Sequence, residues 1–308
     1  MAITAQIVEA IWALVDPWFF MGISASWLPY TIKTLVKDGH TGTLFSPSKF
    51  QDAWFSNFWG WAGPNIKLRA QERVLPLLEG RVQGGRIVDE PIGPGIEGVC
   101  IEVGPGSGFW VDIFSDKRLD RSTSATSNDD GVGLQGAVAS QGGNRKPVTR
   151  VYGVEPSHDQ HVNLRKNISE AGLENVYEIV PVGIEDLDDP SKWGDKIEKG
   201  SVDCIVSILC LCSIPDPQHN LKELYKYLKP GGRWYVYEHV RIDHSWGMRM
   251  YQAFVNLFWP HFLGGCQLCR PTELWMKEAG PWEKIDVGQP SDEQWHQVVP
   301  HILGVYTK

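Results

Sequence analysis

The chain has 308 residues, of which 42% are hydrophobic and 21% are charged, the composition of a folded globular protein of one or two domains. With 29 Lys and Arg against 37 Asp and Glu, the formal net charge is −8, and no Lys- or Arg-rich run appears. We therefore expect no nucleic-acid partner, because binding to phosphate backbones requires a basic face. The six Cys and the lack of a typical signal peptide favour a reducing, cytoplasmic compartment.

Aromatic residues are concentrated in residues 1–61, which hold 13 of them and few charges. The stretch Ala10–Ile32 is long enough to cross a bilayer and has a single charge, at Asp16. Pro17 and Pro29 interrupt it, so a transmembrane helix is the less favoured interpretation. We predict instead a helical, aromatic-rich lid over a substrate pocket, which also allows peripheral contact with a membrane surface. The Trp residues expected to wall that pocket are Trp12, Trp18, Trp27, Trp54, Trp59 and Trp61.

From Val99 onward, short apolar strands alternate with helical patterns, which predicts a doubly wound α/β fold with a parallel sheet covered on both faces. Helices are expected over His161–Ala171 and Asn220–Leu228. The expected strands are Val99–Val103, Val151–Val154, Val176–Val180, Val202–Leu209 and Trp234–Glu238, with a closing hairpin of Lys284–Val287 and His301–Tyr306. Residues 116–147 break this rhythm, because they are rich in Ser, Thr, Asp, Asn and Gly, and we predict a flexible insertion there.

A glycine loop follows the first of these strands. Glu102 begins the pattern E-x-G-x-G-x-G, with glycines at Gly104, Gly106 and Gly108. A dinucleotide loop would need its last glycine one position later, where the chain has Phe109. The observed spacing is the version used for S-adenosylmethionine, which has no pyrophosphate to bind.

An acidic residue, Glu155, ends the next strand and is suited to accept hydrogen bonds from both hydroxyls of a ribose. Glu155 follows Gly108 by 47 residues, and by 15 once the insertion is left out. The second value is close to the interval of about 20 residues found in nucleotide-binding folds. A Pro-Gly-Gly turn within Leu228–Trp234 then leads into the fifth strand.

With these motifs, the chain resembles a class I S-adenosylmethionine-dependent methyltransferase over Val99–Lys308. It is similar in particular to the membrane-associated alkyl-thiol methyltransferases related to the ubiquinone-pathway enzymes, and fungal small-molecule tailoring methyltransferases share the scaffold. The segments that carry this resemblance are Asp16–Trp18, Ser201–Val206, Leu209–Ile214, Tyr237–Val240, Gly264–Arg270 and Pro300–Gly304. The insertion at 116–147 departs from the family pattern.

The resemblance implies where the cofactor binds. Glu102 and the three loop glycines would line the methionine end, and Glu155 would hold the ribose. Ile184 and Glu185 follow the third strand, where the family places adenine contacts, and Ser207 and Leu209 would close the pocket near the sulfonium. Plain core packing is the alternative for Ile184 and Leu209.

Methyl transfer requires alignment of the acceptor, exclusion of water and, for a hydroxyl or thiol, removal of a proton. His239, just past the fifth strand, is the predicted base, and Glu238 would orient it or act in its place. The alternative is that His239 packs under the lid. No metal site is expected, because Cys266 and Cys269 lack a second Cys pair and Cys210 and Cys212 alternate along a strand.

Together these features predict a Rossmann-like, doubly wound, seven-stranded methyltransferase sheet with an N-terminal helical lid. We divide the chain into a lid and substrate segment, 1–95, and an S-adenosylmethionine-binding domain, 96–308. The predicted reaction is methyl transfer to oxygen of a small hydrophobic metabolite in a biosynthetic tailoring step. The alternatives are a thiol S-methyltransferase and a non-catalytic, methyltransferase-like binding protein. The acceptor and the oligomeric state have no signal in the sequence.

Overall fold

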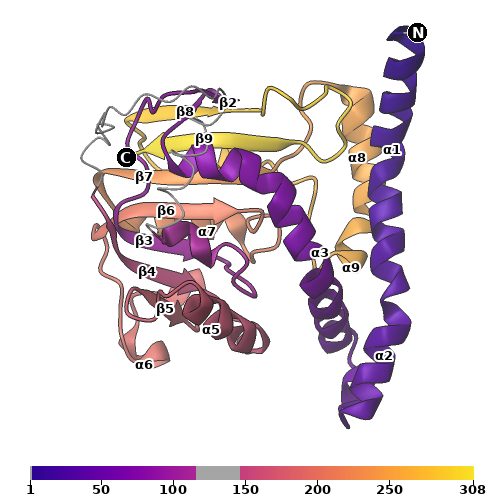
Figure 1. Ribbon diagram of the computed structural model, residues 1–308, viewed down its shortest axis with the longest axis horizontal. Helices are drawn as coiled ribbons and strands as arrows, with labels where there is room; N and C mark the ends of the chain where they lie inside the picture. Colours follow the sequence, from indigo (N-terminus) through magenta and orange to yellow (C-terminus); the bar gives the residue numbers. More distant parts are fainter. Residues whose placement is uncertain (1, 116–145) are drawn as a thin grey trace, which may run out of the picture.

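A computed structural model describes residues 2–115 and 146–308, so nearly all of the predicted insertion lies outside the described residues. Seven of the described strands form a sheet in the order β5-β4-β3-β6-β7-β9-β8, in which β9 runs antiparallel to both of its neighbours, β7 and β8 (Figure 1). The strands are β3 (Gly98–Val103), β4 (Val148–Val154), β5 (Tyr177–Val180), β6 (Val202–Ile208), β7 (Leu228–His239), β8 (Lys284–Gly288) and β9 (His301–Thr307). The predicted doubly wound sheet and its closing hairpin are confirmed.

The strand order places a ligand site at the middle of the sheet. From β3 the chain moves outward to β4 and β5, then crosses back to β6 and β7 on the other side of β3. The adjacent ends of β3 and β6 are therefore a topological switch point, where loops diverge and open α/β sheets bind ligands. These carboxyl ends face the N-terminal helices (Figure 1).

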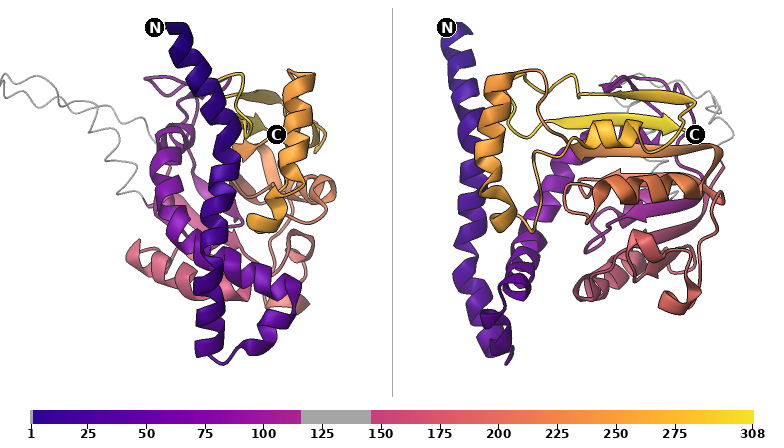
Figure 2. Two further views of the ribbon diagram at one scale, coloured as in Figure 1. Left: turned by 90° about the vertical axis from the view of Figure 1, so that its right-hand side faces the viewer. Right: turned by 180° about the vertical axis from the view of Figure 1, so that it is seen from behind.

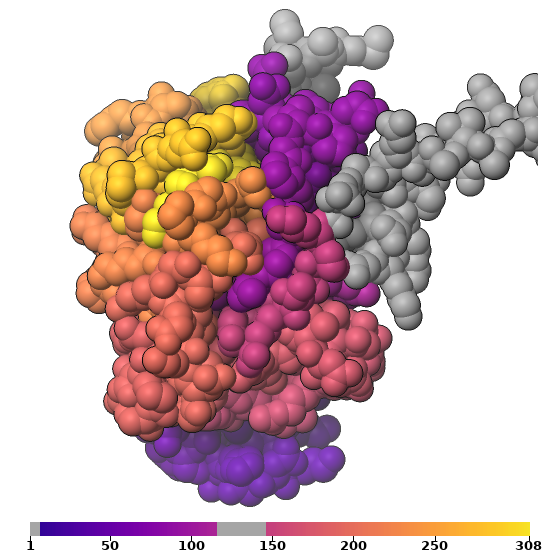
Figure 3. Space-filling view, turned by 90° about the vertical axis from the view of Figure 1, so that its left-hand side faces the viewer, coloured from indigo at the N-terminus to yellow at the C-terminus, as the bar shows by residue number. Residues whose placement is uncertain are grey.

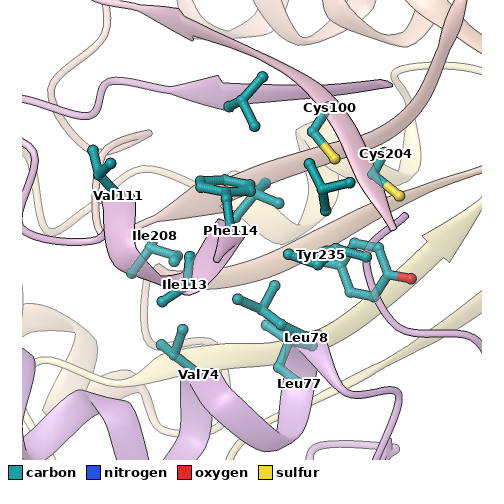
Figure 4. Packing of buried hydrophobic residues seen from close by; sticks show 14 of the residues in the cluster. Val74, Leu77, Leu78, Cys100, Val111, Ile113, Phe114, Cys204, Ile208 and Tyr235 are labelled. Atoms are coloured by element: carbon teal, nitrogen blue, oxygen red, sulfur yellow. The ribbon is translucent and has the colours of Figure 1, made fainter. Parts of the chain in front are cut away.

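Alternating side chains give the sheet two apolar faces. Cys100, Cys204 and Tyr235 point to the face covered by α3 (Pro47–Leu78) and α5 (His161–Glu170), where Val74, Leu77 and Leu78 of α3 pack against them (Figure 4). The intervening residues, such as Ile101 and Trp234, face the other layer. That layer contains α7 (Pro217–Tyr227) and α10 (Thr272–Lys277), while α6 (Pro190–Trp193) is a short surface turn.

The C-terminal half of α3 shares its core with the sheet, although it lies within the segment that we assigned to the lid. A small hairpin, β1 (Val82–Gln83) with β2 (Arg86–Ile87), follows α3 and also precedes residue 95. The division of the chain at residue 95 stays a prediction.

The N-terminal half of the lid is built from α1 (Ala2–Ser26), α2 (Leu28–Lys37) and the first half of α3. Contrary to our expectation, Pro17 does not interrupt α1, which ends at Ser26, and Trp27 is the N-cap of α2. Pro29 lies in the first turn of α2, where the missing N–H has no intrahelical partner to lose. The segment thus forms helices, as predicted, but the break between them lies near Trp27 and not at Pro17.

Helix α1 packs along α8 (Trp246–Asn256) and α9 (Trp259–Phe262) at the side of the molecule that the strand ends face (Figure 2). Trp18 Nε1 donates to Tyr251 Oη at 2.9 Å, and that hydroxyl donates to the carbonyl of Leu14 at 2.7 Å. On the opposite side of the molecule, the N-terminal segments emerge only at the lower edge of the surface (Figure 3). The helices therefore form a separate layer across the carboxyl edge of the sheet.

Candidate active site

The loop after β3 has a backbone that only glycine adopts without strain. The φ angles of Gly104, Gly106 and Gly108 are +60°, +55° and +83°. A Cβ at Gly108 would lie 2.8 Å from Leu164 Cδ1, whereas at Gly106 it would meet no heavy atom within 4 Å. Gly106 therefore presents bare backbone to open space, which a ligand can approach closely.

Glu155, at the end of β4, is 7% exposed and links this loop to the next one. Its Oε2 accepts a hydrogen bond from Gly106 N, and its Oε1 accepts one from Ser157 N, both at 2.9 Å. Burial raises the pKa of Glu155, and the Ser157 and Gly106 N–H groups oppose that rise. Each carboxylate oxygen keeps a further lone pair, so the group present fits a pair of ribose hydroxyls.

Glu102 is almost fully buried one residue before the end of β3, and Tyr177 Oη donates to its Oε2 at 2.5 Å. The contact depends on Gly153, because a Cβ there would lie 2.2 Å from the Tyr177 hydroxyl. Burial raises the pKa of Glu102 to about 7, although the Tyr177 hydrogen bond opposes the shift. Glu102 therefore titrates near neutral pH in the folded protein.

A pocket opens at the glycine loop, between α3 and the ends of β3 and β6. The pocket-lining residues are Trp59, Gly63, Ile66, Lys67, Gly104, Pro105, Gly106, Phe109, Trp110, Ile208 and Leu209. Gly63 lets α3 rest on the loop, since a Cβ there would lie 2.3 Å from Phe109 Cε2. Leu209 has a φ of +54°, a strained backbone of the kind found at functional sites.

Of the other residues expected to contact the cofactor, Ile184 and Ser207 are buried and Glu185 is exposed. Ile184 is buried with the core on the α7 side, and Glu185 next to it is exposed, with its carboxylate folded over Gly183. Ser207 is fully buried, and its Oγ accepts from Trp234 Nε1 at 3.0 Å, on the sheet face away from the pocket. The adenine roles of Ile184 and Glu185 stay predictions. The Ser207 side chain is buried in the core, where its hydroxyl is bonded to Trp234.

Glu238 and His239, the expected catalytic pair, are outside the pocket lining. Glu238 is fully buried, and its two oxygens accept hydrogen bonds from the N–H groups of Cys210 and Leu211, each at 3.1 Å. Burial raises the pKa of Glu238 to about 8, and these donors oppose the rise. Glu238 thus positions the loop that follows Leu209.

The imidazole of His239 packs against that of His301, with ring centroids 4.6 Å apart. Burial, assisted by His301, holds the pKa of His239 well below its usual value, so the ring is neutral at pH 7. A catalytic role for His239 stays a prediction.

Of the six Trp residues predicted to wall the pocket, only Trp59 is among the lining residues of the described pocket. Trp59 lines the pocket, but Trp12 is 62% exposed, and Trp18 and Trp54 form hydrogen bonds within the helical layer. Trp27 and Trp61 pack on each other. Sequence periodicity could not separate these positions, because the helices bury aromatic residues against one another as well as against the pocket.

Several pocket residues had no strong signal in the sequence. Phe109 and Trp110 follow the glycine loop directly, and that proximity alone could have indicated them. Lys67 comes from the middle of α3, and its Nζ lies 2.5 Å from Asp112 Oδ1. Its place at the pocket depends on how α3 crosses the sheet, which no local pattern encodes.

The sheet order, the glycine loop and the acid at the end of β4 define a class I S-adenosylmethionine-dependent methyltransferase. A family model described as a methyltransferase domain matches residues 88–280, and the chain belongs to that family.

Curated relatives match over a shorter region. Thiol S-methyltransferase TMT1B of Homo sapiens is 35% identical over 114 residues, which are 37% of this chain and 46% of that protein. Thiol S-methyltransferase TMT1A of Homo sapiens is 32% identical over 115 residues, again 37% of this chain and 46% of the relative. The matched region thus spans about half the length of these relatives.

Solved structures resemble the chain only distantly. A geranyl diphosphate C-methyltransferase from Streptomyces coelicolor has a TM-score of 0.46 and 13% identity, covering 79% of this chain and 80% of that one. The trans-methyltransferase CalH has a TM-score of 0.44 and 17% identity, covering 91% of this chain and 66% of its own. Similarity at this level supports no inference about ligand or acceptor.

We expect Glu155→Gln to weaken binding of S-adenosylhomocysteine at least about tenfold, since hydrogen bonds to a charged group contribute about 1.5–3 kcal/mol. Isothermal titration calorimetry measures the change. Glu170→Gln, an exposed change on α5, is the matched control and should bind normally. Equal affinities for the two variants would remove Glu155 from the donor site.

The raised pKa of Glu102 predicts a pH-dependent stability. The folded protein binds this proton more tightly than the unfolded chain, so stability falls as pH rises from 4.5 to about 7, by about 3 kcal/mol in all. Glu102→Gln keeps an acceptor for Tyr177 but cannot titrate. Urea unfolding at pH 5 and pH 8 should therefore show a larger loss in the wild type. Equal losses in the two proteins would mean that Glu102 does not titrate in this range.

Proposed function

We propose that the protein transfers the methyl group of S-adenosylmethionine to a small hydrophobic acceptor, and that thiols are its favoured class of acceptor. The observation that carries this proposal is the chemistry of the pocket lining. Its walls are mostly apolar and aromatic, and Lys67 is the single titratable side chain among the described lining residues. An acceptor that loses its own proton easily suits such a pocket best.

The donor supplies an already activated methyl group on a sulfonium. Glu155 and the glycine loop orient the donor, and the strained backbone at Leu209 borders the pocket where the acceptor must enter. Trp59, Phe109 and Trp110 exclude water from the reacting atoms. Lys67 Nζ is paired with Asp112 Oδ1 at 2.5 Å.

Acid strength separates the acceptor classes. The thiol of a cysteine side chain has a pKa of about 8.5 and the phenol of a tyrosine a pKa of about 10, and a thiol is more acidic than the alcohol or phenol with the same carbon skeleton. Transfer to oxygen, our expectation from the sequence, therefore needs a base, and the expected base His239 does not line the pocket. The names of the curated relatives also favour sulfur.

The alternative of a non-catalytic binding protein has less support. A protein that only binds a partner has no need for an open glycine loop beside a buried acid and an apolar pocket. All three features occur together at the switch point of the sheet.

The test uses labelled S-adenosylmethionine and pairs of acceptors with the same carbon skeleton, such as thiophenol with phenol and hexanethiol with hexanol. We expect label in the thiols, and Trp59→Ala should raise KM for them by about tenfold because one stiff apolar wall is lost. Trp61→Ala, on the same helix but outside the pocket lining, is the control. Label in the phenol and hexanol alone would establish the oxygen acceptor, and no label in either thiol with normal donor binding would contradict the proposed acceptor class.

We further propose that the N-terminal layer rests on a membrane surface. The segment Ile7–Lys37 is long and apolar enough to cross a membrane, and only 17% of its most apolar window is buried. Helices α1 and α8 lie side by side (Figure 2). The ring of Trp18 packs against those of Phe254 and Phe258. The exposed large apolar residues on and next to these two helices, called here the α1/α8 face, are Ile7, Val8, Ile11, Trp12, Val15, Phe19, Trp246, Met250, Phe254, Leu257 and Phe258.

Such an extended apolar patch is costly in water and marks an interaction surface. The face belongs to the same helical layer that covers the pocket, so an acceptor dissolved in lipid would have a short path to the reaction site. The net charge of −8 argues against attraction to anionic lipids, which leaves apolar insertion as the driving force.

The triple variant Trp12→Glu, Phe19→Glu, Trp246→Glu should bind phosphatidylcholine vesicles at least about tenfold more weakly than the wild type, because three exposed apolar side chains that would insert into the lipid are replaced by charges. Val162→Glu is the control, since Val162 is 73% exposed but lies on α5. Vesicle cosedimentation measures binding. If the triple variant bound as the wild type does, the α1/α8 face would not be the membrane contact.

A further inference from the structure

Two thiols and an imidazole converge under the helical layer. Cys212 lies in the loop after β6, His239 ends β7, and Cys266 follows α9. Their sulfur and nitrogen ligand atoms all lie within 4.8 Å of one another. Cys212 and Cys266 are 2% and 8% exposed, and neither forms a disulfide.

Hydrogen bonds to backbone carbonyls hold the segments that carry the two thiols. Gln267 N donates to the carbonyl of Cys212 at 3.0 Å, which joins the two cysteine segments directly. Arg270 Nη1 donates to the carbonyls of Leu211 and Ile214, both at 2.7 Å, and so holds the loop on either side of Cys212. These hydrogen bonds fix the backbone segments that carry both thiols.

One polar atom in this cluster has no partner. His239 Nδ1 is buried and forms no hydrogen bond among the described residues. A buried nitrogen left in this state costs about 1–3 kcal/mol, so an unpaired one on a residue of this cluster calls for an explanation. The closest polar contact of the Cys212 thiol outside the cluster is with Ser213 Oγ, at 3.5 Å.

We propose that Cys212, His239 and Cys266 form a site for a zinc ion. Two sulfurs and one imidazole nitrogen are a ligand set that zinc binds in proteins, with a fourth, tetrahedral position left for water or another ligand. Binding releases the two thiol protons to solvent, and the resulting two thiolates and neutral imidazole balance the charge of Zn²⁺. The ion would fasten the segment after α9 to the carboxyl edge of the sheet.

No metal site is predicted from the sequence alone. Cys266 and Cys269 form a C-x-x-C pair, but Cys269 is not among the clustered ligands. Cys212 and Cys266 are 54 positions apart, and only the packing of the segment after α9 on the loop after β6 brings them together. This explains why spacing rules gave no metal site.

The test measures Zn²⁺ and Co²⁺ binding to the reduced, metal-free, full-length chain. We expect about one zinc per chain, and with cobalt a thiolate-to-metal charge-transfer band and the visible spectrum of a tetrahedral site. Cys212→Ser, Cys266→Ser and His239→Gln should each weaken zinc binding by more than about 100-fold. Cys269→Ser is the matched control and should bind as the wild type does.

The cobalt spectrum of the wild type keeps the test decisive even if a buried Cys variant fails to fold. A wild-type protein without the charge-transfer band would overturn the proposal. Zinc binding that survives Cys212→Ser in a folded protein, or that is lost equally in Cys269→Ser, would also overturn it. A rise in Tm on adding zinc to the wild type and to Cys269→Ser alone would support the fastening role.

Discussion

The carboxylate of Glu155 holds together the two loops on which the proposed donor site depends. It accepts one N–H from the loop after β3 and one from the loop after β4, so the positions of both loops follow from a single buried group. The positive φ angles of Gly104 and Gly106 are needed for the first loop to reach it. The helical layer then completes the site, because Gly63 lets α3 settle directly on Phe109.

Local sequence patterns predicted the parts of the protein that are local in space. Strands β3, β4, β5 and β6 were placed within a few residues, since an apolar run between turn signals specifies a buried strand. The glycine loop and Glu155 could be found because a strand, a tight turn and an acid occur in a fixed order along the chain. The start of β7 differs from the predicted strand: pairing begins at Leu228, before the Pro-Gly-Gly turn, and its register with β6 shifts there.

Features that depend on packing between distant segments were missed. The aromatic residues near the N-terminus were correctly expected to form a helical layer, but the choice between pocket, core and exposed face depends on how α1 and α3 cross. Trp59 and Trp12 illustrate this, since one lines the pocket and the other is exposed. The meeting of Cys212 with Cys266 has the same cause, and so does the absence of Glu238 and His239 from the pocket lining.

The most direct test is a crystal structure of the full chain grown with S-adenosylhomocysteine. The account predicts both ribose hydroxyls within hydrogen-bond distance of Glu155, the Gly106 backbone against the ligand, and the sulfur facing the pocket beside Leu209. A ligand bound elsewhere, or bound at the loop with Glu155 contacting only Gly106 and Ser157, would contradict it.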